Sequence, residues 1–66
     1  MNNVKKYRKL AQIKQGDLAA KVDIARQTLS LIENNKFNPS LELCIKLAKA
    51  LNTDLNTLFW EEGIDE

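Results

Sequence analysis

Residues 41–51 are apolar around most of their circumference when they are wound as an α-helix. Their polar side chains, Glu42, Lys46 and Lys49, follow one another at i, i+4 and i+7 and form a single narrow stripe. A helix of this kind is stable only when other elements cover its apolar sides. The sequence therefore predicts a central helix around which the rest of the chain packs.

Four other segments repeat apolar residues at helical spacing and can cover this central helix. The predicted helices extend from Asn2 or Asn3 to about residue 12, over 15–21, over 25–34, over 41–51, and over a short last segment capped by Thr53 or Asp54. Gly and Pro are scarce and no long alternation of apolar and polar residues occurs, which disfavours a sheet. We expect an all-α, compact five-helix bundle, and the residues leave open whether 59–64 add a short β-strand.

The chain has 66 residues, one cysteine and no histidine. A single cysteine forms no internal disulfide, and the lack of histidine removes both zinc sites of the Cys/His kind and the commonest general base. An apolar stretch of about 18 residues and a signal peptide are also missing. We therefore expect a cytoplasmic binding protein that is not an enzyme and uses no cofactor, metal or membrane.

Charge is divided unevenly along the chain. Residues 1–36 carry eight Lys or Arg and three Asp or Glu, a net charge of +5, whereas residues 37–66 carry two and six, a net charge of −4. A basic half is typical of a protein that turns one side toward a polyanion and its acidic side away from it.

The helices predicted over 15–21 and 25–34 are separated by about three residues, as in a helix-turn-helix. Arg26, Gln27 and Thr28 open the second of these helices. In the major groove of DNA, Arg can pair with guanine and Gln with adenine. We therefore predict that these three side chains contact base pairs.

The two sides of that second helix differ in character. Leu29 and Ile32 fall on the side expected to be buried, whereas Leu31 falls one turn beyond Gln27 on the outward side. An apolar side chain in this position can contact the methyl group of thymine. Leu31 is therefore added to the predicted base-contacting residues.

Three blocks of the chain, QGDLA at 15–19, RQTLSLIEN at 26–34 and FNPSL at 37–41, resemble the xenobiotic-response-element (Cro/phage-repressor) helix-turn-helix family. The resemblance covers about residues 3 to 59, and the very short stand-alone repressors such as the cytolysin repressor look most similar. It implies five helices, a recognition helix in the major groove, and a dimer formed near the C-terminus.

The resemblance also implies roles for individual residues. It places the base contacts at Arg26, Gln27, Thr28 and Leu31, the phosphate contacts at Gln15, Asn35, Lys36 and Asn38, and a buried structural ion pair at Arg8 and Glu33. The chain departs from the family pattern at Lys14, Gly16, Asp23 and Ala25. Each departure weakens a helix start or strains a turn by about 0.5 to 1 kcal/mol, but none removes a base-contacting group.

The last predicted helix carries more large apolar side chains than the core of a small protein needs. Surface scaling predicts that only about 60% of the surface of such a chain is buried on folding, so we expect self-association. The interface is predicted at Leu55, Leu58, Phe59 and Trp60. Residues 59–66 are interpreted as a dimerisation segment with an acidic tail within one DNA-binding domain, residues 1–66.

Cys44 is predicted to be a small buried hydrophobe, and Lys5, Lys6 and Lys9 are predicted to form a solvated face.

These features together predict a homodimeric repressor that binds an inverted repeat in double-stranded DNA through the major groove. Repression is favoured over activation because the residues show no effector domain, and no small-molecule ligand is evident. The alternative is an antitoxin or another protein-interaction module that uses DNA binding for autoregulation. An RNA-binding role or an enzymatic one is disfavoured by the few aromatic residues and the lack of histidine.

Overall fold

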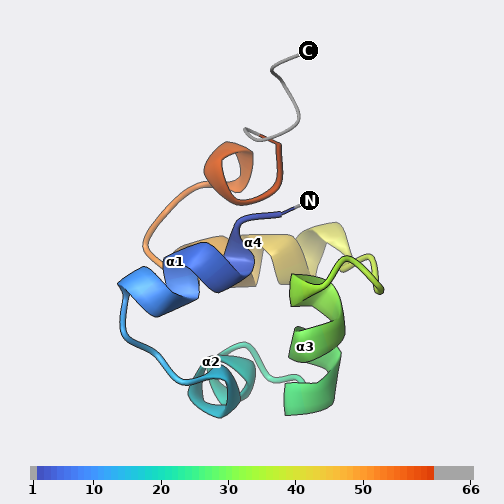
Figure 1. Ribbon diagram of the computed structural model, residues 1–66. Coiled ribbons are helices and arrows are strands. Elements are labelled where there is room, and N and C mark those ends of the chain that lie inside the picture. The colour runs from blue at the N-terminus through green and yellow to red at the C-terminus, as the bar shows by residue number, and fades with distance from the viewer. Residues whose placement is uncertain (1, 61–66) are drawn as a thin grey trace.

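The computed structural model describes residues 2–60, and these residues form five helical elements (Figure 1). They are α1 (Val4–Leu10), α2 (Gln15–Lys21), α3 (Arg26–Glu33), α4 (Leu41–Ala50) and the π-helix η1 (Asn56–Trp60). The all-α prediction is confirmed. The sequence left open a strand over 59–64, and the first two of these residues, Phe59 and Trp60, belong to η1. Residues 61–64 of that segment and the acidic tail lie outside the described residues.

The elements are arranged so that α1 lies between η1 on one side and the α2–α3 pair on the other (Figure 1). Asn3 ties the start of α1 to η1, since its backbone N–H donates to the Leu58 carbonyl at 2.7 Å and its side-chain amide donates to the Thr57 carbonyl at 2.8 Å. The two ends of the described chain, α1 and η1, are therefore held together, and α1 packs against the α2–α3 pair.

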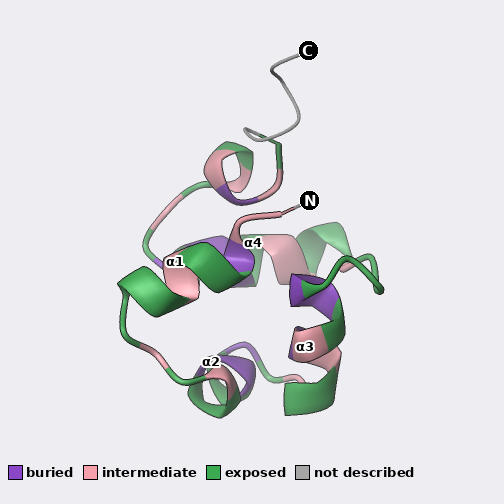
Figure 2. Ribbon diagram, viewed as in Figure 1, coloured by how far each residue is buried: buried purple, intermediate pink, exposed green. Residues whose placement is uncertain are grey.

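The apolar core draws on every helix. Its buried members are Val4, Leu18, Ala19, Val22, Leu29, Ile32, Leu47, Ala48, Leu51 and Leu58. The second half of α4 is covered, but Leu41 and Ile45 in its first half are exposed (Figure 2). The prediction of a helix covered on all its apolar sides is therefore wrong at Leu41 and Ile45, although Leu43 between them packs against the core.

Each of the four α-helices is followed by a residue in the left-handed conformation, which lies two positions after the last helical residue. These residues are Gln12, Asp23, Asn35 and Asn52, with φ between 58° and 64°. At the first of them, the Gln12 N–H donates to the Lys9 carbonyl at 3.0 Å and the Ile13 N–H to the Arg8 carbonyl at 3.1 Å. This pair of bonds defines a Schellman motif, and it recurs at the other three helix ends.

Replacing Gln12 with glycine should stabilise the protein. A left-handed residue with a Cβ costs about 1 to 2 kcal/mol, while glycine costs about 0.5 to 1 kcal/mol in chain entropy, so we expect a net gain of about 0.5 to 1 kcal/mol. Urea denaturation followed by circular dichroism measures the change. Gln12→Ala is the control, because it keeps the Cβ and should bring no gain. If the two variants were equally stable, the left-handed conformation of Gln12 would not be strained by its Cβ.

The helix starts are capped unequally. Ser40 Oγ accepts from the Leu43 N–H at 3.1 Å at the start of α4, and Asp54 Oδ1 accepts from the Thr57 N–H at 2.7 Å before η1. Lys14 and Ala25, which precede α2 and α3, make no side-chain cap hydrogen bond. The helix-turn-helix therefore owes its stability to packing, as the departures from the family pattern predict.

The cap at Asp54 should make η1 sensitive to acid. The hydrogen bond from the Thr57 backbone N–H, followed by one from the Thr57 side chain, lowers the pKa of the Asp54 carboxyl. Because this pKa is lower in the folded state, the ionised Asp54 carboxyl stabilises η1 at pH values above the ordinary pKa of an Asp side chain. This stabilisation is lost as the pH falls through the lowered pKa. We expect the emission of Trp60, the one tryptophan of the chain, to change in that acid range. Asp54→Asn keeps an acceptor oxygen but does not titrate, so the same acid transition in that variant would contradict the assignment.

Candidate nucleic-acid interface

The outward side of α3 is not packed against the rest of the described chain. Arg26, Gln27 and Leu31 are exposed and Thr28 is half-buried. Leu29 and Ile32, on the opposite side, have no exposed surface. The sequence pattern therefore orients this helix correctly, and its predicted base-contacting side chains are available to a ligand.

A buried ion pair fixes the inner side of α3. Arg8 Nε lies 2.7 Å from Glu33 Oε2, and the two side chains are 11% and 2% exposed. The Arg8 Nη1 group also donates to the Ile13 carbonyl at 3.0 Å, so one guanidinium joins α1, the turn after it and α3. The ion pair implied by the family resemblance is confirmed.

Gln15, at the first position of α2, connects this ion pair to the surface. Its Nε2 group donates to Glu33 Oε1 at 3.1 Å, and its Oε1 accepts from Arg26 Nη1 at 3.4 Å. Because a carboxylate only accepts hydrogen bonds, Glu33 fixes the amide with its nitrogen inward and its oxygen toward Arg26. The second N–H of the amide is then left to donate to an outside acceptor such as a phosphate oxygen.

The loop between α3 and α4 presents the other predicted phosphate contacts. Asn35, Lys36 and Asn38 are all exposed. The Lys36 N–H donates to the Leu31 carbonyl at 2.8 Å, and the side-chain amide of Asn2 donates both to the Ile32 carbonyl at 2.7 Å and to Asn35 Oδ1 at 3.1 Å. The loop is thus held to the end of α3 at its first residues.

Asn2 is a positioning residue that sequence reasoning missed. It was predicted only as a possible cap of the first helix, and its Oδ1 does accept from the Val4 N–H at 3.0 Å. Its amide nitrogen reaches residues thirty and thirty-three positions away, at the end of α3 and just after it. No local sequence pattern signals so distant a contact.

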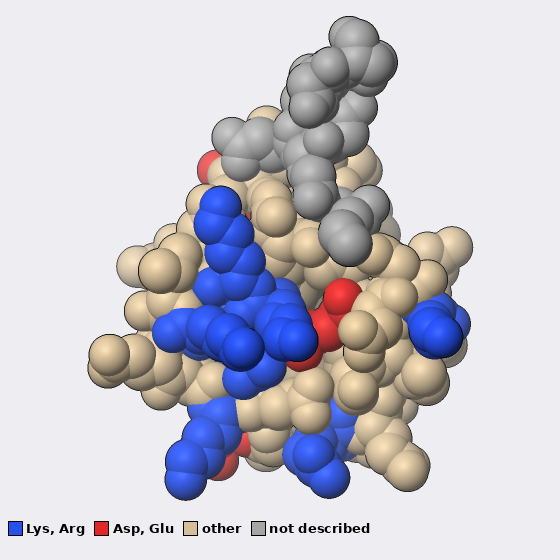
Figure 3. Space-filling view, viewed as in Figure 1, with Lys and Arg blue, Asp and Glu red and all other residues tan. Residues whose placement is uncertain are grey.

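Basic side chains gather over α1, and others lie toward the α2–α3 side of the same face (Figure 3). Lys5, Lys6 and Lys9 are exposed, as predicted for a solvated face. The Lys6 Nζ atom lies 5.7 Å from the centre of the Tyr7 ring, within the range of a cation–π contact. The positive potential of this face favours the approach of a polyanion.

The predicted interface residues divide into three classes of exposure. Leu58 has no exposed surface and packs in the core, so its assignment to an interface is wrong. Leu55 and Phe59 are partly buried against the core. Trp60 is exposed, and Phe37 and Leu41 are exposed apolar residues that the prediction missed. The excess of apolar residues in the helix over 41–51 was a signal that could have pointed to Leu41.

Cys44, predicted to be a small buried hydrophobe, is half-buried, and its Sγ lies 3.9 Å from the Pro39 carbonyl oxygen. Burial raises the pKa of the Cys44 thiol. Among residues 2–60, no group of three or more His, Cys, Asp or Glu side chains could hold a metal ion. The helices of this part of the chain are all too short or too polar to cross a bilayer.

Comparisons with known proteins agree with this geometry. A helix-turn-helix family model matches residues 4–58. An uncharacterized HTH-type transcriptional regulator of Methanocaldococcus jannaschii is 41% identical over 58 residues, which are 88% of each chain. Control protein C.SmaI of Serratia marcescens is 34% identical over 62 residues, 94% of this chain and 74% of that protein. The nearer likeness to the cytolysin repressor stays a prediction.

A solved SinR protein/SinI protein complex contains a chain of similar fold, with a TM-score of 0.81 and 35% sequence identity. The match covers 96% of this chain but only 64% of that one. The shared part includes all five helical elements described above, since almost the whole of the present chain is aligned.

Proposed function

Since the chain belongs to the helix-turn-helix family of transcriptional regulators, we propose that it is a homodimeric repressor that binds an inverted repeat in double-stranded DNA. It acts in the cytoplasm, without catalysis or a cofactor, by occupying promoter DNA. Residues 1–66 serve as one DNA-binding domain.

The outward side of α3 supports this proposal most strongly. The major groove is about 12 Å wide and admits a single α-helix. The exposed Arg26 guanidinium can donate two hydrogen bonds to guanine, and the exposed Gln27 amide can both donate to and accept from adenine. Leu31 is 43% exposed one turn further along, where a thymine methyl group can reach it. Arg26 is also restrained by Gln15, which reduces the entropy lost when it pairs with a base.

The proposed phosphate contacts lie on both sides of α3 in the sequence. Gln15 precedes α3 in the helix-turn-helix, and Asn35, Lys36 and Asn38 follow it in the loop. In a two-fold dimer, the two α3 helices must enter successive major grooves about 34 Å apart. The operator should then be an inverted repeat whose half-sites have that spacing.

Selection of bound sequences from random duplex DNA tests the proposal. We expect an enriched inverted repeat, and binding to it that weakens linearly with the logarithm of the salt concentration. The control is a duplex of the same composition with its half-sites scrambled. Selection that enriches no sequence would refute the proposed reading of bases.

Gln27→Ala and Lys36→Ala should weaken DNA binding in different ways. Loss of the Gln27 amide should cost about 1 to 3 kcal/mol on the selected operator and relax the preference at one base pair. Loss of the Lys36 charge should weaken binding to all sequences alike and reduce the salt slope by about 1. Fluorescence anisotropy on operator and scrambled duplexes measures both. Identical effects of the two variants would contradict the division into base and phosphate contacts.

A second function, a module that binds another protein and uses DNA for autoregulation, is favoured by two observations. The chain is similar over 96% of its length to part of a SinR protein/SinI protein complex, and it exposes Trp60 at the end of η1. Sedimentation of the protein purified with its genomic neighbours separates the two functions. A stable complex with a different protein in place of the homodimer would favour this second function.

A further inference from the structure

Asn2 lies just before α1 and joins three separate points of the described chain. Its Oδ1 atom accepts from the Val4 N–H at 3.0 Å, at the start of α1. Its Nδ2 group donates to the Ile32 carbonyl at 2.7 Å, near the end of α3, and to Asn35 Oδ1 at 3.1 Å, in the loop that follows. Asn2 is half-buried. This short polar side chain therefore connects the segment before α1 to the loop that carries the proposed phosphate contacts.

The partners of Asn2 leave its amide only one orientation. A backbone N–H can only donate and a backbone carbonyl can only accept, so the Val4 N–H selects the oxygen of the amide and the Ile32 carbonyl selects its nitrogen. The amide nitrogen carries two hydrogens, and the Ile32 carbonyl and Asn35 Oδ1 take one each. Asn2 therefore presents a donor, and not an acceptor, to Asn35.

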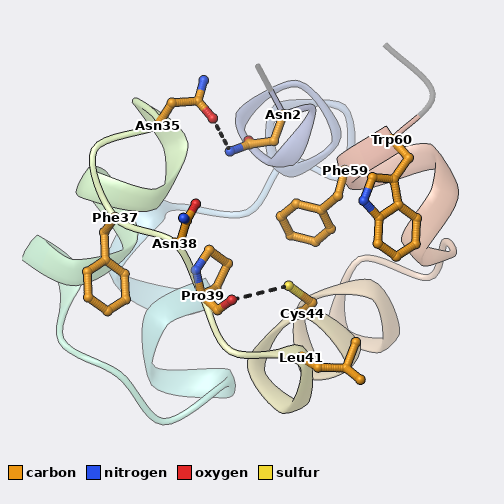
Figure 4. Close-up of a pocket in the computed structure, with 9 residues that line it drawn as sticks. All are labelled: Asn2, Asn35, Phe37, Asn38, Pro39, Leu41, Cys44, Phe59 and Trp60. Carbon is orange, nitrogen blue, oxygen red and sulfur yellow. Dashed lines mark hydrogen bonds between the residues drawn. The ribbon is translucent and has the colours of Figure 1, made fainter. Parts of the chain in front are cut away.

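The orientation of Asn2 in turn sets the orientation of the Asn35 amide. Because Asn35 Oδ1 accepts from Asn2, the nitrogen of the same amide points away from Asn2 (Figure 4). Asn35 is exposed, and its backbone N–H donates to the Ile32 carbonyl at 3.1 Å, so its backbone is held as well. The N–H donors of the Asn35 side chain are thus presented from a fixed position.

Gln15 shows a similar arrangement on the other side of α3 in the sequence. Its nitrogen is held inward by Glu33, and one N–H is left for an outside acceptor. A phosphate oxygen only accepts hydrogen bonds, so an amide that presents N–H groups can bind it and an amide that presents its oxygen repels it. Both amides are therefore fixed by contacts within the fold, and a fixed donor loses less entropy when it binds.

We propose that Asn2 is a positioning residue for DNA binding, which holds the Asn35 amide with its N–H groups toward a phosphate oxygen. The proposal rests on the proposed function, since it takes DNA as the source of the phosphate. The restraint comes from the segment before α1, far from the helix-turn-helix in the sequence. Its loss should weaken binding to every DNA sequence alike, because phosphate contacts carry no sequence information.

Asn2→Asp separates this role from the hydrogen bond at the start of α1. A carboxylate keeps an acceptor for the Val4 N–H, and its charge before the first helical residue suits the helix dipole. It has no N–H to donate to Ile32 or Asn35, so we expect the Asn35 amide to turn its nitrogen inward and its oxygen toward the DNA. Fluorescence anisotropy on operator and scrambled duplexes measures the resulting rise in Kd.

Asn3→Asp is the matched control, because it adds the same charge one residue away, also before α1. It removes a bond of the same kind, from the Asn3 amide to the Thr57 carbonyl at 2.8 Å, but leaves the contact with Asn35 in place. General repulsion between the new charge and DNA therefore acts in both variants. We expect the Kd of Asn2→Asp to exceed that of the control about tenfold on both duplexes. Equal Kd values would overturn the positioning role.

Asn35→Gly shows whether Asn2 acts through Asn35. Glycine removes the amide and suits the left-handed backbone at this position, where φ is 60°. In this background, Asn2→Asp and Asn3→Asp should bind DNA with Kd values within about twofold of each other. An excess loss that persists would mean that Asn2 acts by supporting the end of α3 through Ile32, and the proposal would be refuted.

The orientation itself is tested without DNA by nuclear magnetic relaxation of the side-chain amides. We expect a higher order parameter for the Asn35 amide than for the amide of Asn38, which is exposed in the same loop. Asn2→Ala should lower the Asn35 order parameter to the level of Asn38, and Asn3→Ala should leave it unchanged. An Asn35 amide as mobile as that of Asn38 in the unaltered protein overturns the orientation, whether or not DNA binds.

Two outcomes separate this proposal from the proposed function. If Asn35→Gly binds DNA like the unaltered protein, Asn35 holds no phosphate and the positioning role fails, whereas an enriched inverted repeat still supports the repressor. If selection enriches no sequence, the proposed reading of bases fails. The relaxation experiment then still decides whether Asn2 orients the Asn35 amide.

Discussion

Arg8→Ala should lower the free energy of unfolding by about 3 to 5 kcal/mol, because it leaves the Glu33 carboxylate charged and buried without its partner. A domain of this length has a total stability of only about 3 to 10 kcal/mol. We therefore expect a large unfolded fraction at 37 °C, detected by loss of helical circular dichroism and by a lower urea midpoint.

The paired substitution Arg8→Met with Glu33→Leu is the control for this prediction. Replacing both charges of a buried pair with apolar residues of similar size is often neutral or stabilising. The double variant should therefore recover most of the lost stability. It also removes the acceptor that orients Gln15, so its affinity for DNA should stay reduced. If the double variant is as unstable as Arg8→Ala, burial of an unpaired charge is not the cause.

Leu58→Ala should cost about 2 to 5 kcal/mol, since Leu58 has no exposed surface and its truncation leaves a cavity. The substitution keeps the backbone carbonyl that accepts from the Asn3 N–H, so the loss measures packing alone. Urea denaturation at low protein concentration, where the monomer predominates, gives the value.

Trp60→Ala serves as the comparison for Leu58→Ala. Trp60 lies in the same helix but is exposed, so its truncation should change monomer stability little and weaken the proposed dimer instead. The opposite result, a stable Leu58→Ala monomer that no longer pairs, would return Leu58 to the interface and contradict its place in the core.

Helical spacing predicted the fold well because amphipathic periodicity is a local property. Leu18, Leu29 and Ile32 are buried as their spacing indicates, and Gln27 and Leu31 face outward. The ion pair between Arg8 and Glu33 came from the family resemblance, since no periodic pattern joins residues so far apart. The orientation of the candidate site was therefore largely predictable.

The errors lie where tertiary packing overrides local pattern. Residues 55–59 were read as part of a short α-helix with an apolar interface, but the structure has a π-helix, η1, in which Leu58 has no exposed surface and Trp60 is exposed. The exposed first half of α4 could not be predicted either, because its cover depends on how far the other helices extend. Both errors concern η1 and the first half of α4, where burial depends on contacts between elements that lie apart in the sequence.

The left-handed helix ends have a consequence for how this protein can change. Gln12, Asp23 and Asn52 lie outside the proposed DNA contacts, whereas Asn35 lies among them. Glycine in place of Gln12, Asp23 or Asn52 should therefore raise the stability of the fold without changing DNA recognition. A variant stabilised in this way would tolerate destabilising substitutions on α3. Such substitutions could change the operator sequence that the protein binds.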